Sequence, residues 1–388
     1  MLYNCLKMGR PTINGNLQMW HPSSSTPALR KIWTLVLFLL CCFIFYVGRT
    51  HLSGPRRPWF DHADIIPHKM WQSWKVDALS FEDRDSERAR AWTAKNPDWR
   101  YEVLTDGNAV AYVEQHFGPK GFGRPDIVKI FKALDGRLKI IQADLLRYLI
   151  MYVEGGLWAD IDAEALSPIS RFIPSRFEES SVDMIIGIET DEPDFLTHPI
   201  LGSKAQSFCQ WTFLTKPGHP AMLTLVEDIL QWLKRLSTES GKAIADLDLD
   251  FDQVLSGTGP SAFTHAILAH MSATIGREVT WSENFHDMSD STLVGGTLVL
   301  PAEAFAAGTG HSRSGTHSGS RALVKHHFHA SGWTSKHPRR KHPVYGEVER
   351  CNWNKACVEL WDENVGAFSK LSQQQQSEMI RTTQARDA

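Results

Sequence analysis

The sequence predicts an α/β fold with a mostly parallel central sheet, preceded by a single transmembrane helix. Short apolar runs alternate with stretches of helical periodicity, and turn residues separate them, which is the pattern of alternating strands and helices. Residues 32–48, IWTLVLFLLCCFIFYVG, carry no charge and would span about 25 Å as a helix, which predicts the membrane segment. With 388 residues, 42% of them hydrophobic, the chain is long enough for one large globular domain or two modest ones.

The N-terminal region is expected to anchor the protein in a membrane. A cleaved signal peptide is the alternative interpretation of residues 32–48, but no small-x-small cleavage site follows the apolar run. We therefore expect a cytoplasmic tail at 1–31, an uncleaved signal anchor at 32–48 and a stem at 49–63. A globular domain at 64–345 and a C-terminal extension at 346–388 would follow on the far side of the membrane.

The first half of the globular domain is expected to alternate strands with helices. The predicted elements are, in order, a strand at 65–71, a helix at 80–96, a strand at 99–104, and helices at 108–117 and 126–134. Gln72, Ser73 and Trp74 would form the loop that leaves the first strand. Ser80 is the candidate N-cap of the first helix, and Asn96 before Pro97 is its stop signal.

The stretch at 142–166, QADLLRYLIMYVEGGLWADIDAEAL, carries most of the information in the chain. Its first half repeats apolar residues at three- and four-residue intervals, which predicts an amphipathic helix. Asp144, Arg147 and Tyr148 fall together on another face of that helix.

A double glycine and two aspartates follow this helix. Gly155 and Gly156 are expected to end it, because glycine readily adopts the left-handed conformation of a helix C-terminus. The apolar residues from Leu157 to Ile161 then predict a buried strand. Asp160 and Asp162 share one parity, so both carboxylates can point the same way. Such a buried pair is costly without a cation, and Mn²⁺ or Mg²⁺ would bind both oxygens and neutralise a diphosphate leaving group.

The D-x-D spacing alone is weak evidence, because the chain contains it elsewhere. Asp83-Arg84-Asp85 and the run from Asp246 to Asp252 show it in polar or repeated-acid surroundings, where we expect a solvated surface. The two central aspartates differ in following a buried strand and a helix with a matched Asp144 and Arg147. A simple i, i+3 ion pair explains that match too, but beside a metal and a diphosphate the same groups could orient a sugar's hydroxyls.

The second half is expected to continue the alternation of strands and helices. The predicted elements are a strand at 184–188 that ends at Glu189, a helix at 220–237, a tight turn at 257–260 that begins a further helix, a mobile loop at 308–321 and a frayed tail at 372–388. Glu189 and Asp191 are candidates for contacts with an acceptor substrate.

Charge and cysteine positions narrow the class of protein. The formal net charge of −3, with no basic stripe, gives no indication of a nucleic-acid partner. Cys351 and Cys357 bracket a short segment and could form a disulfide in an oxidising compartment, or could remain two thiols.

Several of these blocks resemble glycosyltransferase family 32, whose members carry a D-x-D motif. QADLLRYLIMYVEGGLWADID resembles the family signature, IPHKMWQSWK its opening strand and NPDWRYEVLTD its second strand. IIGIETDEP, SFCQWTFLTKPGHPAM and SGTGPSAFT resemble the fungal initiation-specific alpha-1,6-mannosyltransferases of that family in particular. The resemblance covers about residues 64–335.

The resemblance implies a type II Golgi membrane enzyme whose lumenal domain, at 64–345, has a GT-A fold. It implies metal-dependent, retaining transfer of mannose from GDP-mannose to a mannose hydroxyl, through an alpha-1,6 linkage, on N-linked glycans. Asp160 and Asp162 match the metal and diphosphate motif, with Mn²⁺ or Mg²⁺ as the cofactor. Asp144 and Arg147 match the positions that hold the donor sugar.

Further substrate and metal contacts are implied. Gln72, Ser73 and Trp74 match the loop near the nucleotide. The substrate-binding residues are therefore expected to be Asp144, Arg147, Tyr148, Gln72, Trp74 and Glu189. A late histidine would complete the metal site, and the segment HHFHASGW leaves His326, His327 and His329 as candidates, with His327 favoured.

Alternatives to this function remain. A relative in the same family could mannosylate inositol-phosphoceramide or use another nucleotide sugar. The chain could also be a non-catalytic subunit of a Golgi mannan polymerase complex, although Asp144, Arg147, Asp160 and Asp162 are all present. Other mannosyltransferases are therefore candidate partners of this chain.

Overall fold

The described residues are 65–329 and 341–387 of this computed structural model, and all of them belong to the compact unit Phe60–Ala388. The predicted tail, anchor and stem lie outside the described residues. Within the two described ranges, we find no helix that is long and apolar enough to cross a membrane.

The central sheet has eight strands, seven of them in the order β2-β1-β3-β7-β5-β9-β8, with β6 paired to β5. The strands are β1 (Lys69–Trp74), β2 (Arg100–Thr105), β3 (Gly156–Ala159), β5 (Met184–Asp191), β6 (Gln206–Phe208), β7 (Thr212–Thr215), β8 (Thr292–Val294) and β9 (Thr297–Leu300). Strands β2, β1, β3, β5 and β9 run in one direction, whereas β7 and β8 run in the other. The predicted α/β fold with a mostly parallel central sheet is therefore confirmed. A separate two-stranded sheet pairs β4 (Ala163–Ala165) with β10 (Val324–His326).

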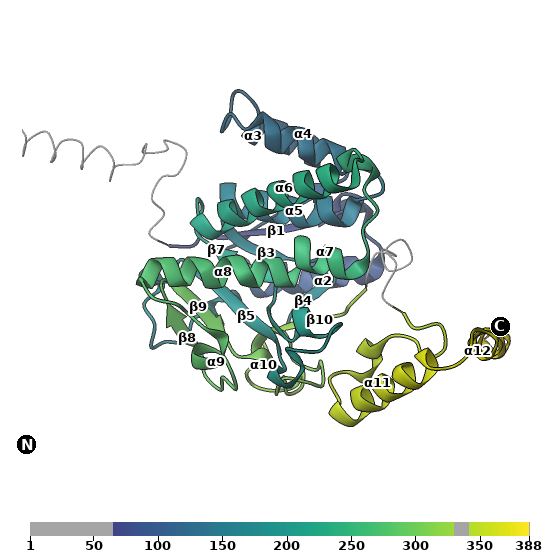
Figure 1. Ribbon diagram of the computed structural model, residues 1–388. Coiled ribbons are helices and arrows are strands. Elements are labelled where there is room, and N and C mark those ends of the chain that lie inside the picture. The colour runs from purple at the N-terminus through teal and green to yellow at the C-terminus, as the bar shows by residue number, and fades with distance from the viewer. Residues whose placement is uncertain (1–64, 330–340, 388) are drawn as a thin grey trace, which may run out of the picture. The chain divides into compact units, whose positions relative to one another are not determined.

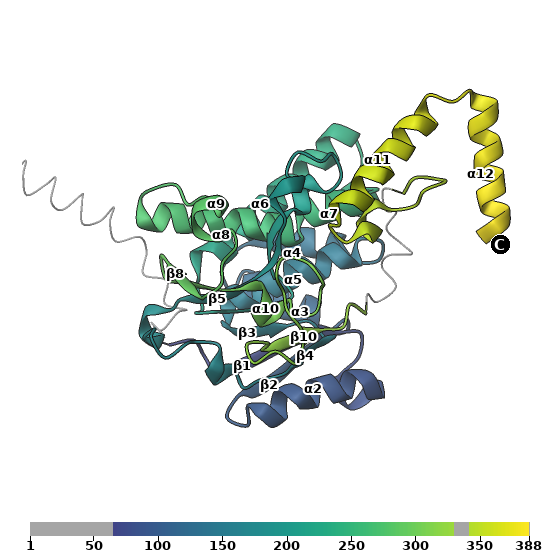
Figure 2. The same cartoon turned by 90° about the horizontal axis from the view of Figure 1, so that it is seen from below.

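Helices cover both faces of the central sheet. The helices of the domain are α2 (Asp83–Lys95), α3 (Ala109–Phe117), α4 (Pro125–Ala133), α5 (Lys139–Val153), α6 (Pro220–Ser240), α7 (Phe251–Gly257), α8 (Pro260–Ile275), α9 (Trp281–Asn284) and α10 (Ala302–Phe305), and the C-terminal extension adds α11 (Lys355–Ser369) and α12 (Gln373–Asp387). Side chains alternate along a strand, so Trp71 and Trp158 join the core with α5, α6 and α8, while Met70 and Leu157 join the core with α2 and α10. Figure 1 shows α5 and α6 above β1, β3 and β7, and Figure 2 shows α2 beside β1 and β2.

Helix α5 lies where the sequence predicts it, but it is buried on nearly all sides. It packs against β1, β3 and β7 on one side and against α6 on the other. Almost every side chain from Ile141 to Tyr152 is buried, including those of Asp144 and Arg147. The face that carries Asp144 and Arg147 is buried as well, because Thr258 and Asp160 pack against it. The polar residues of α5 must therefore be paired inside the protein.

The double glycine ends α5 as predicted. Gly155 and Gly156 have φ values of +62° and +91°, which are left-handed conformations that favour glycine. A Cβ atom on Gly156 would lie 2.4 Å from the carbonyl oxygen of Lys69 in β1. The strand after the glycines is shorter than predicted, because the chain turns at Asp160, whose carbonyl accepts a hydrogen bond from the Ala163 N–H at 2.9 Å.

Other predicted boundaries shift as well. Gln72 to Trp74 pair with β2 as part of β1, so the predicted loop is strand. Glu82 occupies the N-cap position of α2 without a side-chain hydrogen bond, whereas Ser80 ends a single 3-10 turn before it. Strand β5 continues past Glu189 as far as Asp191.

The acidic runs that the sequence predicts to be solvated are partly used for structure. Asp250 caps α7, because its side chain accepts a hydrogen bond from the Gln253 N–H at 2.8 Å. Asp252 forms an ion pair with Lys204 at 2.7 Å. Asp85 is only 2% exposed and lies 3.5 Å from Arg88. The spacing of these carboxylates gave no indication of these different uses.

The C-terminal extension contains two helices. Cys351 and Cys357 form a disulfide before and within α11, so the paired interpretation of these cysteines holds. Val348 and Val358 pack in a small core with Phe195. Residues 373–387 form helix α12, so the prediction of a frayed tail is wrong.

Candidate active site

A cavity of about 680 Å³ opens at the carboxyl ends of β1, β2, β3 and β5. These ends contribute Trp74, Thr105, Asp160 and Glu189 to its lining. Ligand sites of open α/β sheets lie at this edge, because the loops that leave parallel strands meet there. The cavity is therefore the place where the predicted functional residues should meet.

Arg147 joins carboxylates from two different elements inside this cavity. Its NH2 nitrogen lies 3.0 Å from Oδ1 of Asp160, and its NH1 nitrogen lies 2.9 Å from Oδ1 of Asp144, at an angle that does not suit a hydrogen bond. The indole N–H of Trp158 donates to the same Asp160 oxygen at 2.8 Å. The predicted pair of Asp144 and Arg147 thus exists, and it extends to the D-x-D motif.

Thr258 holds the second oxygen of Asp144. Its hydroxyl donates to Asp144 Oδ2 at 2.7 Å, and its carbonyl accepts from the Tyr148 hydroxyl at 2.8 Å. Burial raises the pKa of Asp144 to about 6, although the Arg147 charge opposes the rise. The sequence indicated only a turn at Thr258, because the threonine reaches Asp144 through the packing of α8 and not through any local motif.

His326 is the histidine that lies with the aspartates. Its Nε2 atom lies 3.2 Å from Asp162 Oδ1, and ligand atoms of Asp160, Asp162 and His326 all lie within 4.8 Å of one another. The backbone N–H of His329 donates to Asp162 Oδ2 at 2.7 Å. Burial would raise the pKa of Asp162, but the contacts with His326 and the His329 N–H lower it below its ordinary value.

His327, which the sequence favoured as the metal ligand, faces away from the aspartates. Strand β10 pairs with β4 so that His326 lies opposite Ala163 and Lys325 lies opposite Glu164. His327 follows the last residue of β10, and its side chain contacts a different carboxylate from that of His326. His327 Nε2 lies 2.9 Å from Glu164 Oε2. The geometry therefore favours His326 as the third ligand.

The cavity carries an excess of negative charge around Arg147. Four carboxylates, those of Asp144, Asp160, Asp162 and Glu189, surround this one guanidinium, whereas Lys75, Arg137 and Lys139 line the more exposed part of the cavity together with Asp106. Burial raises the pKa of Asp160 and of Glu189, as expected for carboxylates that lack enough positive charge. Two aspartates and an imidazole are suitable ligands for a divalent cation, so this group could hold one.

Two predicted substrate-binding residues do not line the cavity. Gln72 is 1% exposed, donates from Nε2 to the Asp160 carbonyl at 3.0 Å, and accepts a hydrogen bond from Tyr101. Tyr148 is fully buried, and its hydroxyl also contacts Gln210. Both residues support the cavity wall from behind, because their side chains point into the protein.

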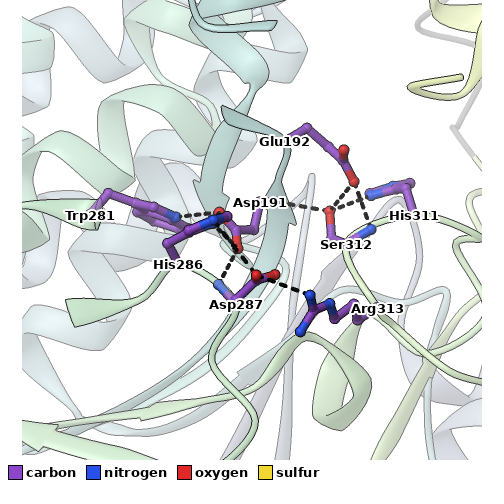
Figure 3. Close-up of polar contacts among 8 residues, drawn as sticks. All are labelled: Asp191, Glu192, Trp281, His286, Asp287, His311, Ser312 and Arg313. Atoms are coloured by element: carbon purple, nitrogen blue, oxygen red, sulfur yellow. Dashed lines mark hydrogen bonds and ion pairs between the residues drawn. The ribbon is translucent and has the colours of Figure 1, made fainter. Parts of the chain in front are cut away.

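A second group with metal-ligand side chains lies at the end of β5, outside the cavity lining. Asp191 Oδ1 accepts from the Trp281 indole N–H at 2.8 Å, and Oδ2 accepts from the Asp287 N–H at 2.8 Å, with His286 Nδ1 3.1 Å away (Figure 3). Because nitrogen donors already occupy both oxygens, Asp191 ties the loop after α9 to β5. Asp191 therefore has no free oxygen for the predicted contact with an acceptor substrate.

The neighbouring residue ties down the segment at 308–321, which the sequence predicts to be a mobile loop. Glu192 Oε1 accepts hydrogen bonds from the Ser312 N–H at 2.7 Å and from its hydroxyl at 3.0 Å (Figure 3). Ser312 and Arg313 have φ values of +54° and +55°, which non-glycine residues adopt only when their surroundings hold them. The loop therefore adopts a defined set of turns against β5.

Comparison with known proteins agrees with the D-x-D interpretation. Residues 82–181, which contain the two aspartates, match the glycosyltransferase sugar-binding region containing a DXD motif. The chain is 31% identical over 274 residues to an initiation-specific alpha-1,6-mannosyltransferase of Schizosaccharomyces pombe, a match that covers 70% of this chain and 64% of that protein. A protein of the same description from Candida albicans is 28% identical over 294 residues, covering 70% of this chain and 73% of the relative.

Solved structures add little to this comparison. The PaToxG glycosyltransferase is 14% identical and covers 55% of this chain and 72% of its own, with a TM-score of 0.37, which is too low to show a common fold. The sequence comparisons are the informative ones. The chain contains a DXD-type glycosyltransferase sugar-binding region, and its relatives include fungal alpha-1,6-mannosyltransferases.

Proposed function

We propose that this protein is a metal-dependent, retaining glycosyltransferase that moves mannose from GDP-mannose to a mannose hydroxyl, through an alpha-1,6 linkage, on N-linked glycans. The observation that carries the proposal is the excess of buried carboxylates around Arg147 at the carboxyl ends of the parallel strands. The two mannosyltransferase relatives support the choice of mannose. A GT-A fold is part of the same proposal.

Asp160, Asp162 and His326 are the proposed ligands of a divalent cation, with Mn²⁺ as the first candidate and Mg²⁺ as the second. When bound, the cation would supply the positive charge that stabilises a departing diphosphate. Arg147 and Trp158 fix the Asp160 carboxylate before any ligand arrives, because each donates to its Oδ1 atom. Such a preorganised site loses little energy to rearrangement when the substrate binds.

The donor is proposed to lie between α5 and the ends of β1 and β2. Asp144 and Arg147 would orient the mannose hydroxyls, because both side chains line the cavity and Thr258 and Asp160 hold them in place. Trp74 lines the cavity at the end of β1, where its ring would face the nucleotide.

Glu189 is proposed to contact the acceptor. Its Oε1 atom accepts from the Trp211 indole N–H at 3.1 Å, whereas its buried Oε2 atom has no hydrogen-bond partner among the described residues. Glu189 lines the cavity and can accept a hydrogen bond from a sugar hydroxyl there. A buried polar atom without a partner is costly, so a substrate hydroxyl at this position would be stabilising.

We place the domain in the Golgi lumen, behind a single-pass type II anchor at 32–48. The disulfide between Cys351 and Cys357 supports an oxidising compartment. Complex formation with other mannosyltransferases belongs to this proposal as well.

A matrix of donors and acceptors tests the function directly. The full-length chain, purified in detergent, would be offered GDP-mannose, UDP-galactose or UDP-N-acetylglucosamine, with an alpha-mannoside or inositol-phosphoceramide as acceptor, with and without Mn²⁺. We expect transfer only from GDP-mannose to the mannoside in the presence of Mn²⁺. Transfer from a UDP-sugar or to the lipid would support the alternative enzymes, and no transfer at all would support a non-catalytic subunit.

Asp162→Asn tests the site within the same assay. It should lower transfer by about a thousandfold or more, because the side chain keeps its shape but loses the charge that holds the cation. Asp83→Asn is the matched control, since Asp83 belongs to another D-x-D of this chain and is exposed in the first turn of α2. Equal activity of the two variants would show that the site lies elsewhere.

A further inference from the structure

Phe328 stands apart from the other exposed apolar side chains. Among the described residues, the exposed large hydrophobic side chains are Ile65, Val76, Leu79, Leu196, Phe328 and Leu360. Phe328 is 58% exposed, and it is the member of this set that lines the cavity. An exposed aromatic ring in a binding cavity offers apolar surface that a ligand can cover.

The backbone holds Phe328 in this exposed position at a cost. Its φ of +50° is left-handed, which costs a bulky residue about 1–2 kcal/mol. The surrounding turn is bound to Asp162, because the His327 N–H donates to the Asp162 carbonyl at 3.0 Å and the His329 N–H donates to its carboxylate at 2.7 Å. Strain that neighbouring contacts maintain is characteristic of ligand sites.

Phe328 belongs to a continuous wall of four side chains. Its ring contacts His326 edge to face with centroids 4.2 Å apart, and the centroid of the Trp211 ring lies 4.5 Å from that of the same imidazole. Trp211 in turn donates to Glu189 at 3.1 Å. The wall of Phe328, His326, Trp211 and Glu189 thus has an apolar ring at one end and a carboxylate oxygen without a partner at the other.

This wall lies on one side of the aspartates, away from the predicted nucleotide side. In the sheet order, β1 and β2 lie on one side of β3, whereas β5 and its Glu189 lie on the other. The carboxylate of Glu189 would repel a diphosphate but accepts hydrogen bonds from hydroxyl groups. A sugar ring combines hydroxyl donors with apolar C–H faces, so its chemistry matches both ends of the wall.

We propose that the wall of Phe328, His326, Trp211 and Glu189 is the subsite for the acceptor sugar. The apolar face of that sugar packs on the Phe328 ring, and one of its hydroxyls donates to Glu189 Oε2. Trp211 is a positioning residue, because its indole holds Glu189 and His326 in register. The inference rests on the proposed function, since it assigns the acceptor of that reaction.

Ligand-observed NMR tests the subsite without requiring turnover. It would measure the binding of methyl alpha-mannoside to the full-length chain in the presence of GDP and Mn²⁺. We expect Phe328→Ala to weaken mannoside binding about tenfold and Phe328→Trp to preserve it, because tryptophan keeps an aromatic face. Glu189→Gln should weaken binding several-fold while its amide oxygen can still accept from Trp211. Leu360→Ala is the matched control, since Leu360 is equally exposed at 58% but lies outside the cavity lining.

The outcomes separate this inference from the proposed function. If the wild-type chain fails to bind the mannoside, or if Phe328→Ala binds it as tightly as the Leu360→Ala control, the subsite is wrong. If the mannoside binds and Phe328→Ala weakens it, but no mannose is transferred from GDP-mannose, the subsite stands and the proposed reaction fails. A parallel loss of GDP binding in Phe328→Ala would also overturn the assignment, because the ring would then serve the nucleotide.

Discussion

Arg147, Asp144 and Thr258 form a series of contacts that begins at the D-x-D motif and ends at the turn between α7 and α8. Arg147 reaches Asp160 at 3.0 Å, and the Thr258 hydroxyl reaches Asp144 at 2.7 Å. The side chains of Arg147, Asp144 and Thr258 are all buried. The position of the Asp144 carboxylate, the proposed sugar contact, therefore depends on a threonine outside the cavity lining.

Replacing Thr258 with valine should lower the transfer rate by about tenfold, because Asp144 loses a hydrogen bond to a charged oxygen and its orientation with it. Kinetics of mannose transfer would measure this change. Thr264→Val is the control, since the Thr264 hydroxyl accepts from the Phe208 N–H at 2.8 Å outside the cavity lining. Equal effects of the two variants on transfer, at equal loss of stability, would contradict the role of Thr258.

His219 makes folding sensitive to pH at a position remote from the chemistry. The residue is 4% exposed, neither ring nitrogen has a hydrogen-bond partner among the described residues, and His270 packs against it at 4.7 Å. Burial, and then the neighbouring His270, lower the pKa of His219 to about 3, although Asp183 opposes this shift; Lys216 adds a smaller lowering. The unfolded chain therefore binds a proton at pH values where the folded chain does not.

Stability should fall as the pH falls from about 6.5 towards 3, because protonation then favours the unfolded state. Between pH 7 and pH 5 we expect His219 to account for about 2 kcal/mol of this loss. Denaturant titrations at the two pH values would measure it. His219→Asn, which retains a good helix N-cap, should remove that part of the pH dependence, whereas His265→Asn at an exposed position of α8 should not. An unchanged slope in His219→Asn would refute the assignment.

At the scale of the element, the helix–glycine–glycine–strand frame matters more than the D-x-D spacing. Gly156 lets β3 approach β1 so closely that a Cβ atom would meet the Lys69 carbonyl oxygen at 2.4 Å. Any displacement of β3 would move Asp160, which follows the strand directly. The frame thus sets the position of the aspartates.

Gly156→Ala should therefore cost about 2 kcal/mol more stability than a glycine substitution without a clash. Gly241→Ala supplies that comparison, since Gly241 is also left-handed, at φ +65°, but has no atom within 4 Å of the added Cβ. Thermal or denaturant unfolding of both variants would measure the difference. Equal destabilisation would show that the close approach of β3 to β1 is not restrictive.

The long helices and the first parallel strands could be predicted from the sequence, because their apolar periodicity is regular over several turns or residues. The short elements could not: β6 to β9 and α7 are too brief to show a period. The burial of the polar face of α5 could not be predicted either, because Thr258, which packs against Asp144, lies more than a hundred residues further along the chain. Local pattern cannot reveal which faces tertiary packing will bury.

The same limit applies to the site. Asp144, Arg147, Asp160 and Asp162 could be predicted to meet, since they flank one helix and strand. The choice of His326 over His327 depends on the register of β10 against β4, which joins segments about 160 residues apart. Trp211 and Phe328 reach the cavity, and Thr258 reaches Asp144, only through such long-range packing.

At the scale of the whole described domain, the order of the strands separates two halves of the cavity. Strands β1 and β2 lie on one side of β3 and its aspartates, and β5 lies beyond β7 on the other. A donor bound on the first side and an acceptor bound on the second would therefore meet beside Asp160 and Asp162. This arrangement needs a cation to bring a negatively charged diphosphate next to Asp160 and Asp162, which are themselves negative.

Calorimetric titration of GDP into the full-length chain, with Mn²⁺ and then with a chelator, tests that central claim most directly. The account predicts that GDP binds the wild-type chain in the presence of Mn²⁺ and that binding weakens by about a hundredfold or more without it, because the carboxylates then repel the diphosphate. Asp162→Asn should lose the effect of Mn²⁺, whereas His327→Gln should keep it. Equally tight binding of GDP with and without Mn²⁺, or an undiminished Mn²⁺ effect in Asp162→Asn, would contradict the account.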